Sequence, residues 1–297
     1  MSLVRTLIDH EREPQRTSLT HDLHELYDGD LQFPEAGNCP YVIANFVSTL
    51  DGVVSYKIPG HAGGSTISRA DEADRFIMGL LRASVDAVMV GSTTVHDVNP
   101  KTLWTPEYAY PPAARPYADY RLAMQKNLPP LVVIVSGSGQ LDLTRAIFRT
   151  PAVRAAVITT SAGRDELVKA GITALHSVEV HALEANGHHI DARAIMQLLW
   201  RLGVKILLHE GGPTLFGAFL ADGAVNELFL TLSPQVAGRG ERTIRPALIE
   251  GTEFCPDNSP SFELLSLKQR ADDLFMRYRQ GASPHGRRRK RNQGDLS

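Results

Sequence analysis

Cysteine is scarce in this 297-residue sequence: only Cys39 and Cys255 are present, and they lie far apart. They form no CxxC pair, and two distant cysteines cannot supply the disulfide framework that stabilises small secreted domains. The scarcity therefore excludes a disulfide-rich class of protein. It is the usage expected in a reducing compartment, so the sequence predicts a cytoplasmic protein.

Long apolar runs and a strong excess of one charge are also missing. No stretch approaches the roughly 18 apolar residues that a membrane span requires, and residues 5–16 are rich in charge where a secretory signal is apolar. The formal net charge is −2, although five basic residues stand together at 287–291. We interpret residues 281–297 as a disordered basic tail. We expect no membrane or nucleic-acid partner, but a small-molecule substrate.

Several common catalytic signatures are absent as well. The sequence contains no GxGxxG, GxxxxGK[ST] or GxSxG, so the fingerprints of Rossmann, P-loop and α/β-hydrolase proteins are missing. It has 11 histidines but no HExxH and no cysteine-rich zinc spacing, and we expect no metal. The pair His96-Asp97 is either an acid–base pair or a surface turn before Pro100.

Apolar strand patterns alternate with helical patterns along the chain. Predicted strands cover 41–47, 85–90, 131–135, 155–159, 204–208 and 225–232, with a final pair within 262–279. Predicted helices are one capped by Ser68 with Asp71 three residues later, and others over 164–170, 191–202 and 213–221. The alternation predicts an α/β fold with three layers, in which helices cover both faces of a mainly parallel sheet and the C-terminal strands form antiparallel edges.

The same patterns suggest one domain over residues 41–280, preceded by an extension over 1–40 with a short helix at 22–27. The segment 101–130 has no periodicity and holds several prolines and tyrosines. A loop of this length is either a lid or interface element, or a surface insertion packed by its own aromatic side chains.

Polar, glycine-rich sequences follow four of the predicted strands, at 48–52, 91–94, 136–139 and 210–214. Ligands of parallel sheets collect at the carboxyl ends of the strands. Gly211 and Gly212 let a ligand approach the backbone, and Pro213 suits the first position of a helix whose N-terminus attracts a pyrophosphate. One such junction alone is often only a tight turn, but several at successive strand ends predict a phosphate-bearing ligand.

Two charged residues need partners. Glu210 follows an apolar strand, so its carboxylate is expected to be partly buried and to contact a ligand hydroxyl or amine, or a structural N–H. Arg82 ends a predicted helix, where a favourable interaction with the helix dipole is a sufficient explanation unless it faces the same cleft.

These segments resemble the reductase family of riboflavin biosynthesis that is defined by the RibD C-terminal domain, over roughly residues 41–280. The matching motifs are Ser48-Thr49-Leu50-Asp51-Gly52, Val90-Gly91-Ser92-Thr93-Thr94-Val95 with Asn99-Pro100, Ile134-Val135-Ser136-Gly137, Glu210-Gly211-Gly212-Pro213-Thr214-Leu215 and Phe219-Leu220-Ala221-Asp222-Gly223. The resemblance implies a dihydrofolate-reductase-like fold, a homodimer and NADPH-dependent reduction of 5-amino-6-(5-phosphoribosylamino)uracil. In that reaction a hydride passes from NADPH to the ribosylamino carbon, while an acid supplies a proton.

The resemblance also implies residue roles. Glu210 and Asp51 would be catalytic, and Arg82, Gly64, Ser65 and Asp97 would contact the substrate. The cofactor contacts would be Ser55, Thr66, Gly91, Ser92, Thr94, Ser136, Gly137, Gly211, Gly212, Pro213, Thr214 and Leu215.

Two departures from the family pattern lie at the substrate end. The family usually has a lysine where Asn45 stands and an aspartate where Val98 stands, with Asp97 one place earlier here. Two alternatives therefore remain open. One is a dihydrofolate-reductase-like paralogue that reduces a different pterin, pyrimidine or carbonyl compound, and the other is a nucleotide-binding module without turnover.

Overall fold

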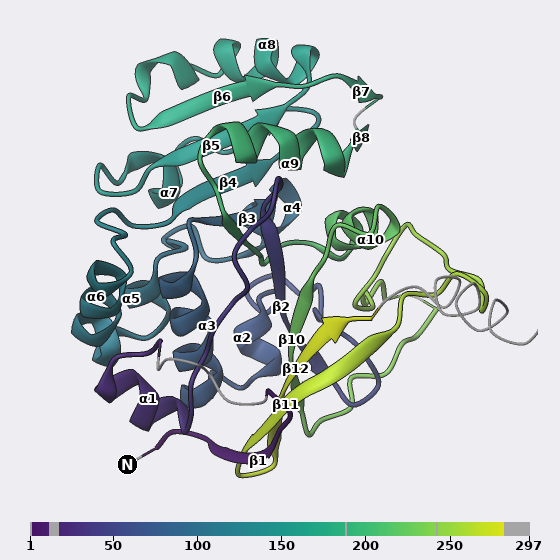
Figure 1. The fold of residues 1–297 in the computed structure, drawn as a ribbon. Helices are drawn as coiled ribbons and strands as arrows, with labels where there is room; N and C mark the ends of the chain where they lie inside the picture. The colour runs from purple at the N-terminus through teal and green to yellow at the C-terminus, as the bar shows by residue number, and fades with distance from the viewer. Residues whose placement is uncertain (1, 12–17, 188, 242, 282–297) are drawn as a thin grey trace, which may run out of the picture.

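A ten-stranded sheet organises the protein in a computed structural model that describes residues 2–11, 18–187, 189–241 and 243–281 (Figure 1). The strands are β1 (Arg5–Asp9), β2 (Tyr41–Thr49), β3 (Ala87–Gly91), β4 (Leu131–Val135), β5 (Ala155–Thr159), β6 (Val178–Ala182), β9 (Ile206–His209), β10 (Glu227–Ser233), β11 (Phe262–Arg270) and β12 (Asp273–Gln280). Their order across the sheet is β1-β11-β12-β10-β2-β9-β3-β4-β5-β6. A small hairpin of β7 (Ala185–Asn186) and β8 (His189–Ile190) lies outside it.

The sheet is parallel from β10 to β6, while β12, β11 and β1 pair in antiparallel fashion. This confirms the predicted α/β class and its mainly parallel sheet. The outermost antiparallel strand is nevertheless β1, which the sequence patterns missed, and it pairs with β11 rather than lying over the domain. The predicted basic tail from residue 282 onward lies outside the described residues.

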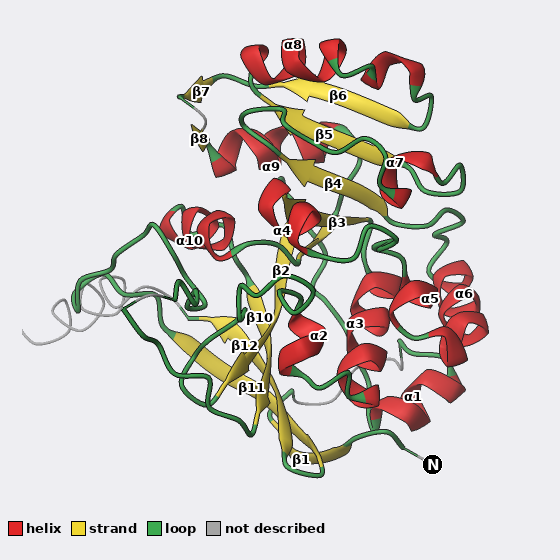
Figure 2. Cartoon of the chain, turned by 180° about the vertical axis from the view of Figure 1, so that it is seen from behind, coloured by secondary structure: helices red, strands yellow, loops and turns green. Residues whose placement is uncertain are grey.

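Helices cover both faces of the sheet, as Figures 1 and 2 show from opposite sides. Along β3, Val88 and Val90 belong to one apolar core, whereas Ala87 and Met89 belong to the other, as the two-residue period of a strand requires. The helices are α1 (His21–Tyr27), α2 (Gly64–Ile67), α3 (Glu72–Ser84), α4 (Ser92–Asp97), α5 (Pro106–Ala109), η1 (Pro111–Ala113), α6 (Ala114–Ala123), α7 (Ala146–Arg149), α8 (Ser161–Lys169), η2 (Ile172–Ala174), α9 (Ala192–Arg201) and α10 (Pro213–Ala221). None of the described helices is both long and apolar enough to cross a membrane.

The start of α3 differs from the prediction. Asp71 itself caps the helix, because its carboxylate accepts the backbone N–H groups of Ala73 and Asp74. The predicted cap, Ser68, is wrong since Arg69 and Ala70 both adopt positive φ and turn the chain before the helix begins. The predicted start of α10 at Pro213 is confirmed.

The segment 101–130 is helical rather than an irregular loop. It forms α5, η1 and α6, and its Trp104, Tyr117 and Tyr120 are buried in the core that also contains α3. The hydroxyl of Tyr117 donates to the carbonyl of Phe76 at 2.8 Å. The alternative of a surface insertion packed by its own aromatic side chains is therefore wrong, because Trp104, Tyr117 and Tyr120 pack into the core of the domain. A role as a lid or interface element stays a prediction.

Candidate active site

Two adjoining cavities lie at the carboxyl edge of the parallel strands, with volumes of about 1180 and 540 Å³. We call them the larger and the smaller cavity. Their walls share Phe46, Gly64, Thr94, Asp97 and Glu210, so the two form one continuous cleft. The cleft brings together residues that follow β2, β3 and β9, as expected for ligand sites of open α/β sheets.

The glycine-rich turn after β9 forms a wall of the smaller cavity. Gly212 caps α10 with a φ of +54°, a backbone region that favours glycine. Gly211 lies against β3 so closely that a Cβ would come within 2.4 Å of the Cα of Val90. Only glycine fits there, and the first N–H groups of α10 are left free of helical partners beside the cavity.

The second wall of the smaller cavity comes from β3 and α4. Gly91 caps α4, and the hydroxyl-bearing residues Ser92, Thr93 and Thr94 line the space with it. Gly137, after β4, also lines this cavity. Ser136 does not line it, but its buried hydroxyl has no hydrogen-bond partner among the described residues.

A buried ion pair stands where the two cavities join. Arg82 Nη2 lies 2.7 Å from Glu210 Oε2, and Arg82 Nε lies 3.0 Å from Oε1. The two side chains are only 4% and 8% exposed. Arg82 also donates from Nη1 to the carbonyl of Thr105 at 3.3 Å. Among the described residues the partner of the Glu210 carboxylate is thus an arginine, and Arg82 does face the cleft.

Asp97 lines both cavities and pairs with Lys57. The Nζ of Lys57 lies 2.5 Å from an oxygen of Asp97, and this pair connects α4 to the loop after β2. His96 is 83% exposed, with its ring 3.5 Å from Asp97. The exposure of His96 favours the surface turn over the acid–base pair, whereas Asp97 lines the cleft.

A family model named RibD C-terminal domain matches residues 40–275. The chain belongs to this family. A 2,5-diamino-6-ribosylamino-4(3H)-pyrimidinone 5′-phosphate reductase of Archaeoglobus fulgidus is 28% identical over 72% of the chain and 88% of that protein. Its counterpart from Methanothermobacter thermautotrophicus is 26% identical over 80% of the chain and 97% of that protein.

Solved structures share the fold. A pyrimidine reductase-like protein from Corynebacterium diphtheriae superposes with a TM-score of 0.63 at 19% identity, covering 82% of this chain and 92% of that one. RibD from Acinetobacter baumannii gives 0.61 at 23% identity, covering 82% and 59% respectively. Likeness at this level of identity establishes the architecture of a RibD C-terminal domain.

Most residues to which the family resemblance gives a role lie in the cleft. Arg82, Ser65 and Thr66 line the larger cavity, and Ser55, Gly91, Ser92, Gly137, Gly212, Pro213, Thr214 and Leu215 line the smaller one, while Gly64, Thr94, Asp97 and Glu210 line both. The hydroxyl of Ser55 donates to the carbonyl of Ala62 at 2.8 Å, so it fixes its own loop.

Asp51, expected to be catalytic, lines neither cavity. Its carboxylate accepts the hydroxyl of Thr49 and the backbone N–H groups of Ala237 and Gly238. These hydrogen bonds, that from Thr49 foremost, lower the pKa of Asp51 to about 2. Its position fits an anchor for the loop after β10, and its catalytic role stays a prediction.

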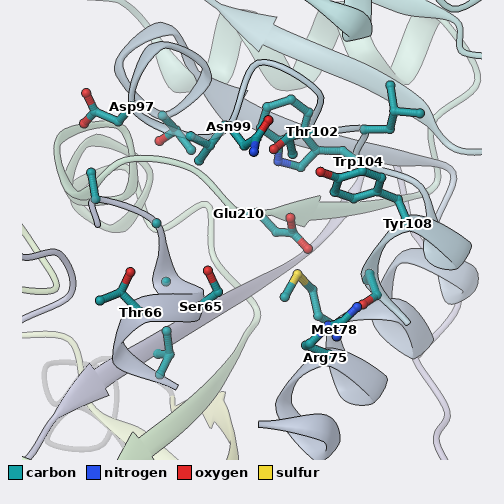
Figure 3. Close-up of a pocket in the computed structure, with 18 of the residues that line it drawn as sticks. Ser65, Thr66, Arg75, Met78, Asp97, Asn99, Thr102, Trp104, Tyr108 and Glu210 are labelled. Carbon is teal, nitrogen blue, oxygen red and sulfur yellow. The ribbon is translucent and has the colours of Figure 1, made fainter. Parts of the chain in front are cut away.

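Several residues that line the larger cavity were not predicted from the sequence. Figure 3 shows Glu210 near Met78 and Arg75 of α3, with Trp104 and Tyr108 on another side. Asp74, Met78 and Arg82 all line the cavity and recur every four residues along α3, so helical spacing from Arg82 could have indicated them. Asp74 is buried, and desolvation raises its pKa to about 6.

The two family departures also lie in this cavity: Asn45 and Val98 both line it. Arg145 lines it too, and it is 8% exposed. Its guanidinium donates to the carbonyls of Val98 and His96 at 2.9 and 2.6 Å and so fixes the chain between α4 and Pro100. The sequence differs from the family pattern at the wall that would contact a substrate.

Proposed function

We propose that this protein is an NADPH-dependent reductase that acts on a phosphorylated ribosylamino-pyrimidine, the substrate class in the names of its relatives. The observation that carries the proposal is the buried Arg82–Glu210 pair at the junction of two cavities. A cofactor in one cavity and a substrate in the other would meet at this pair.

The residues of the smaller cavity fit a dinucleotide. The close approach of Gly211 to β3 leaves no room for a side chain, and the free N–H groups at the start of α10 suit a pyrophosphate. The hydroxyls of Ser92, Thr93 and Thr94 are further donors, while the unpartnered hydroxyl of Ser136 adjoins the cavity through Gly137. When bound, the cofactor supplies the hydride; the protein orients it.

The larger cavity provides the polar groups that a sugar-bearing substrate needs. Each carboxylate oxygen of Glu210 has two lone pairs, and Arg82 approaches the carboxylate from one side. Glu210 therefore retains lone pairs that can accept a hydrogen bond from a substrate hydroxyl or amine. Hydride addition at the ribosylamino carbon also requires a proton on the ring oxygen of the sugar. Asp74, with a pKa near 6, can hold such a proton near neutral pH, and Asp97 lies at the junction.

The test is a titration of purified protein with NADPH and NADH, monitored by nicotinamide fluorescence, followed by NADPH oxidation with the ribosylamino-pyrimidine phosphate. We expect binding of NADPH in preference to NADH and substrate-dependent loss of absorbance at the nicotinamide band. An absence of NADPH binding would overturn the proposal.

A second candidate function is the reduction of a different pterin, pyrimidine or carbonyl compound. It is supported by Asn45 and Val98 and by the wall that residues 102–111 add to the larger cavity. NADPH binding without oxidation by the ribosylamino-pyrimidine would favour this candidate over the first.

A further inference from the structure

His209, the last residue of β9, is buried directly beneath the cleft. It is completely inaccessible to solvent and immediately precedes the turn that leads into α10. The rings of Phe216 and Phe219 stand edge-on to it, with centroids 5.5 and 5.3 Å away, and Phe46 lies at 6.2 Å. It lines neither cavity, so the function proposed above makes no use of it.

Among the described residues the imidazole accepts a hydrogen bond from the turn, and the backbone of Leu215 in the first turn of α10 also interacts with the ring. Nδ1 of His209 accepts the backbone N–H of Gly211 at 3.3 Å. Nδ1 must therefore be unprotonated, so the neutral ring carries its proton on Nε2, which has no hydrogen-bond partner among the described residues. An apolar residue of similar size would avoid burying that unpaired nitrogen, and hence packing alone does not account for histidine here.

The hydrogen bond fixes a turn that is already confined on its other side. Gly211 lies against the backbone of β3, where the Cα of Val90 leaves no space for a Cβ on Gly211. Gly212 then turns the chain with a positive φ. With the N–H of Gly211 engaged by the imidazole, the peptide between Glu210 and Gly211 has one orientation. That orientation determines where the first N–H groups of α10 point, whereas Arg82 holds the side chain of Glu210.

We propose that His209 is a positioning residue for the cofactor: by accepting the N–H of Gly211 it holds the Glu210–Gly212 turn in the conformation that receives the pyrophosphate. The inference rests on the proposed function, since it assigns the turn to NADPH. It adds a buried group, outside both cavities, on which cofactor affinity depends.

The test compares His209→Asn with His209→Leu. The side-chain oxygen of asparagine can occupy the place of Nδ1 and accept the N–H of Gly211, although asparagine leaves a void. Leucine is close to histidine in volume but accepts no hydrogen bond. We expect the Kd for NADPH to stay within about threefold of wild type in the asparagine variant and to rise about tenfold in the leucine variant, a loss of about 1.4 kcal/mol. With substrate, the leucine variant should raise KM for NADPH and leave kcat nearly unchanged.

Phe219→Leu is the matched control, because Phe219 packs on the same imidazole and makes no hydrogen bond to the turn. It should lower Tm and leave the Kd for NADPH unchanged. Hydrogen exchange of the Gly211 amide, measured without cofactor, should be slow in wild type and the asparagine variant and at least tenfold faster in the leucine variant.

Equal NADPH affinity in the leucine variant and wild type would overturn the positioning role while leaving the reductase proposal intact. Failure of the wild-type protein to bind NADPH would instead overturn the proposed function. Rapid exchange of the Gly211 amide in wild type would contradict the hydrogen bond itself, whether or not any variant folds.

Discussion

The Arg82–Glu210 pair should show strong energetic coupling, because it is almost fully removed from solvent and joined by several hydrogen bonds. Removing one partner of a buried ion pair leaves an uncompensated charge and costs about 3 to 5 kcal/mol, a large part of the 5 to 15 kcal/mol by which domains are typically stable. We expect Glu210→Met to fall in that range. Arg82→Met should cost more, since it also removes the hydrogen bonds that Arg82 donates to the carbonyls of Leu103 and Thr105.

The double variant decides whether the pair stabilises the fold or serves the site. Replacing both partners by apolar residues removes the uncompensated charge, so the double variant should be less destabilised than the sum of the single variants by about 2 kcal/mol or more. Free energies of unfolding from urea denaturation would measure this coupling. NADPH oxidation should nevertheless be lost in all three variants, because the polar groups at the junction are gone.

The exposed pair Lys169–Glu166 provides a control cycle, since its side chains are 70% and 49% accessible and solvent screens them. It should show negligible coupling and unchanged activity. Additive effects at Arg82 and Glu210, within about 0.5 kcal/mol, would refute the reasoning about the buried pair. Restored activity in the double variant would refute its place in the reaction.

Four further predictions concern single residues. Burial lowers the pKa of His209 to about 4, so the folded state favours the neutral ring. The contribution of His209 to stability should be full above the unfolded pKa near 6.5 and decline as the pH falls towards 4. His209→Leu should abolish this part of the decline in urea denaturation measured as a function of pH. Burial raises the pKa of Asp74 to about 6, so its ionised form is disfavoured in the folded state. Asp74→Asn should therefore increase the unfolding free energy at pH 7.5 by about 1 to 3 kcal/mol, and this gain should vanish below pH 4. A loss of stability at pH 7.5 would contradict this. Gly211→Ala should abolish NADPH binding in a fluorescence titration, because the added Cβ meets the backbone of Val90, which cannot move aside as a flexible side chain can; tight binding by this variant would mean that the turn is displaced without consequence. Asp51→Asn should lower Tm and keep kcat within about threefold, since Asp51 anchors a loop outside the cleft, and a large fall in kcat at unchanged Tm would return it to the catalytic group.

The position of the cleft could be predicted from the sequence because the relevant signals are local. A two-residue period marks a strand, and a glycine followed by proline marks a turn into a helix wherever it occurs. Because parallel strands have their carboxyl ends at one edge of a sheet, segments that are distant in the chain could be predicted to lie in one site. Gly91, Gly212 and Pro213 could be assigned in this way, with Thr94 beside them, whereas the role of Leu215 came from the family resemblance.

Other features depend on neighbours that no local pattern specifies. The segment 101–130 lacks periodicity because it is divided among three short helices, α5, η1 and α6, whose buried aromatic residues share a core with α3. β1 shows no clear strand pattern, since it is an edge strand with a single hydrogen-bonded neighbour, β11. Asp51 belongs to a family motif, yet its partners at Ala237 and Gly238 lie more than 180 residues away.

The sequence by itself determined the alternation of strands and helices, the glycine turns at the strand ends and the family, because each follows from backbone preferences and spacing within short segments. Only the tertiary structure decided what the charged residues do. Arg82 and Glu210 are 128 residues apart, and each has an ordinary local explanation until the fold places them 2.7 Å from one another in a dry junction. Burial and pairing are properties of the folded surroundings, and they assign the chemistry that composition and spacing leave open.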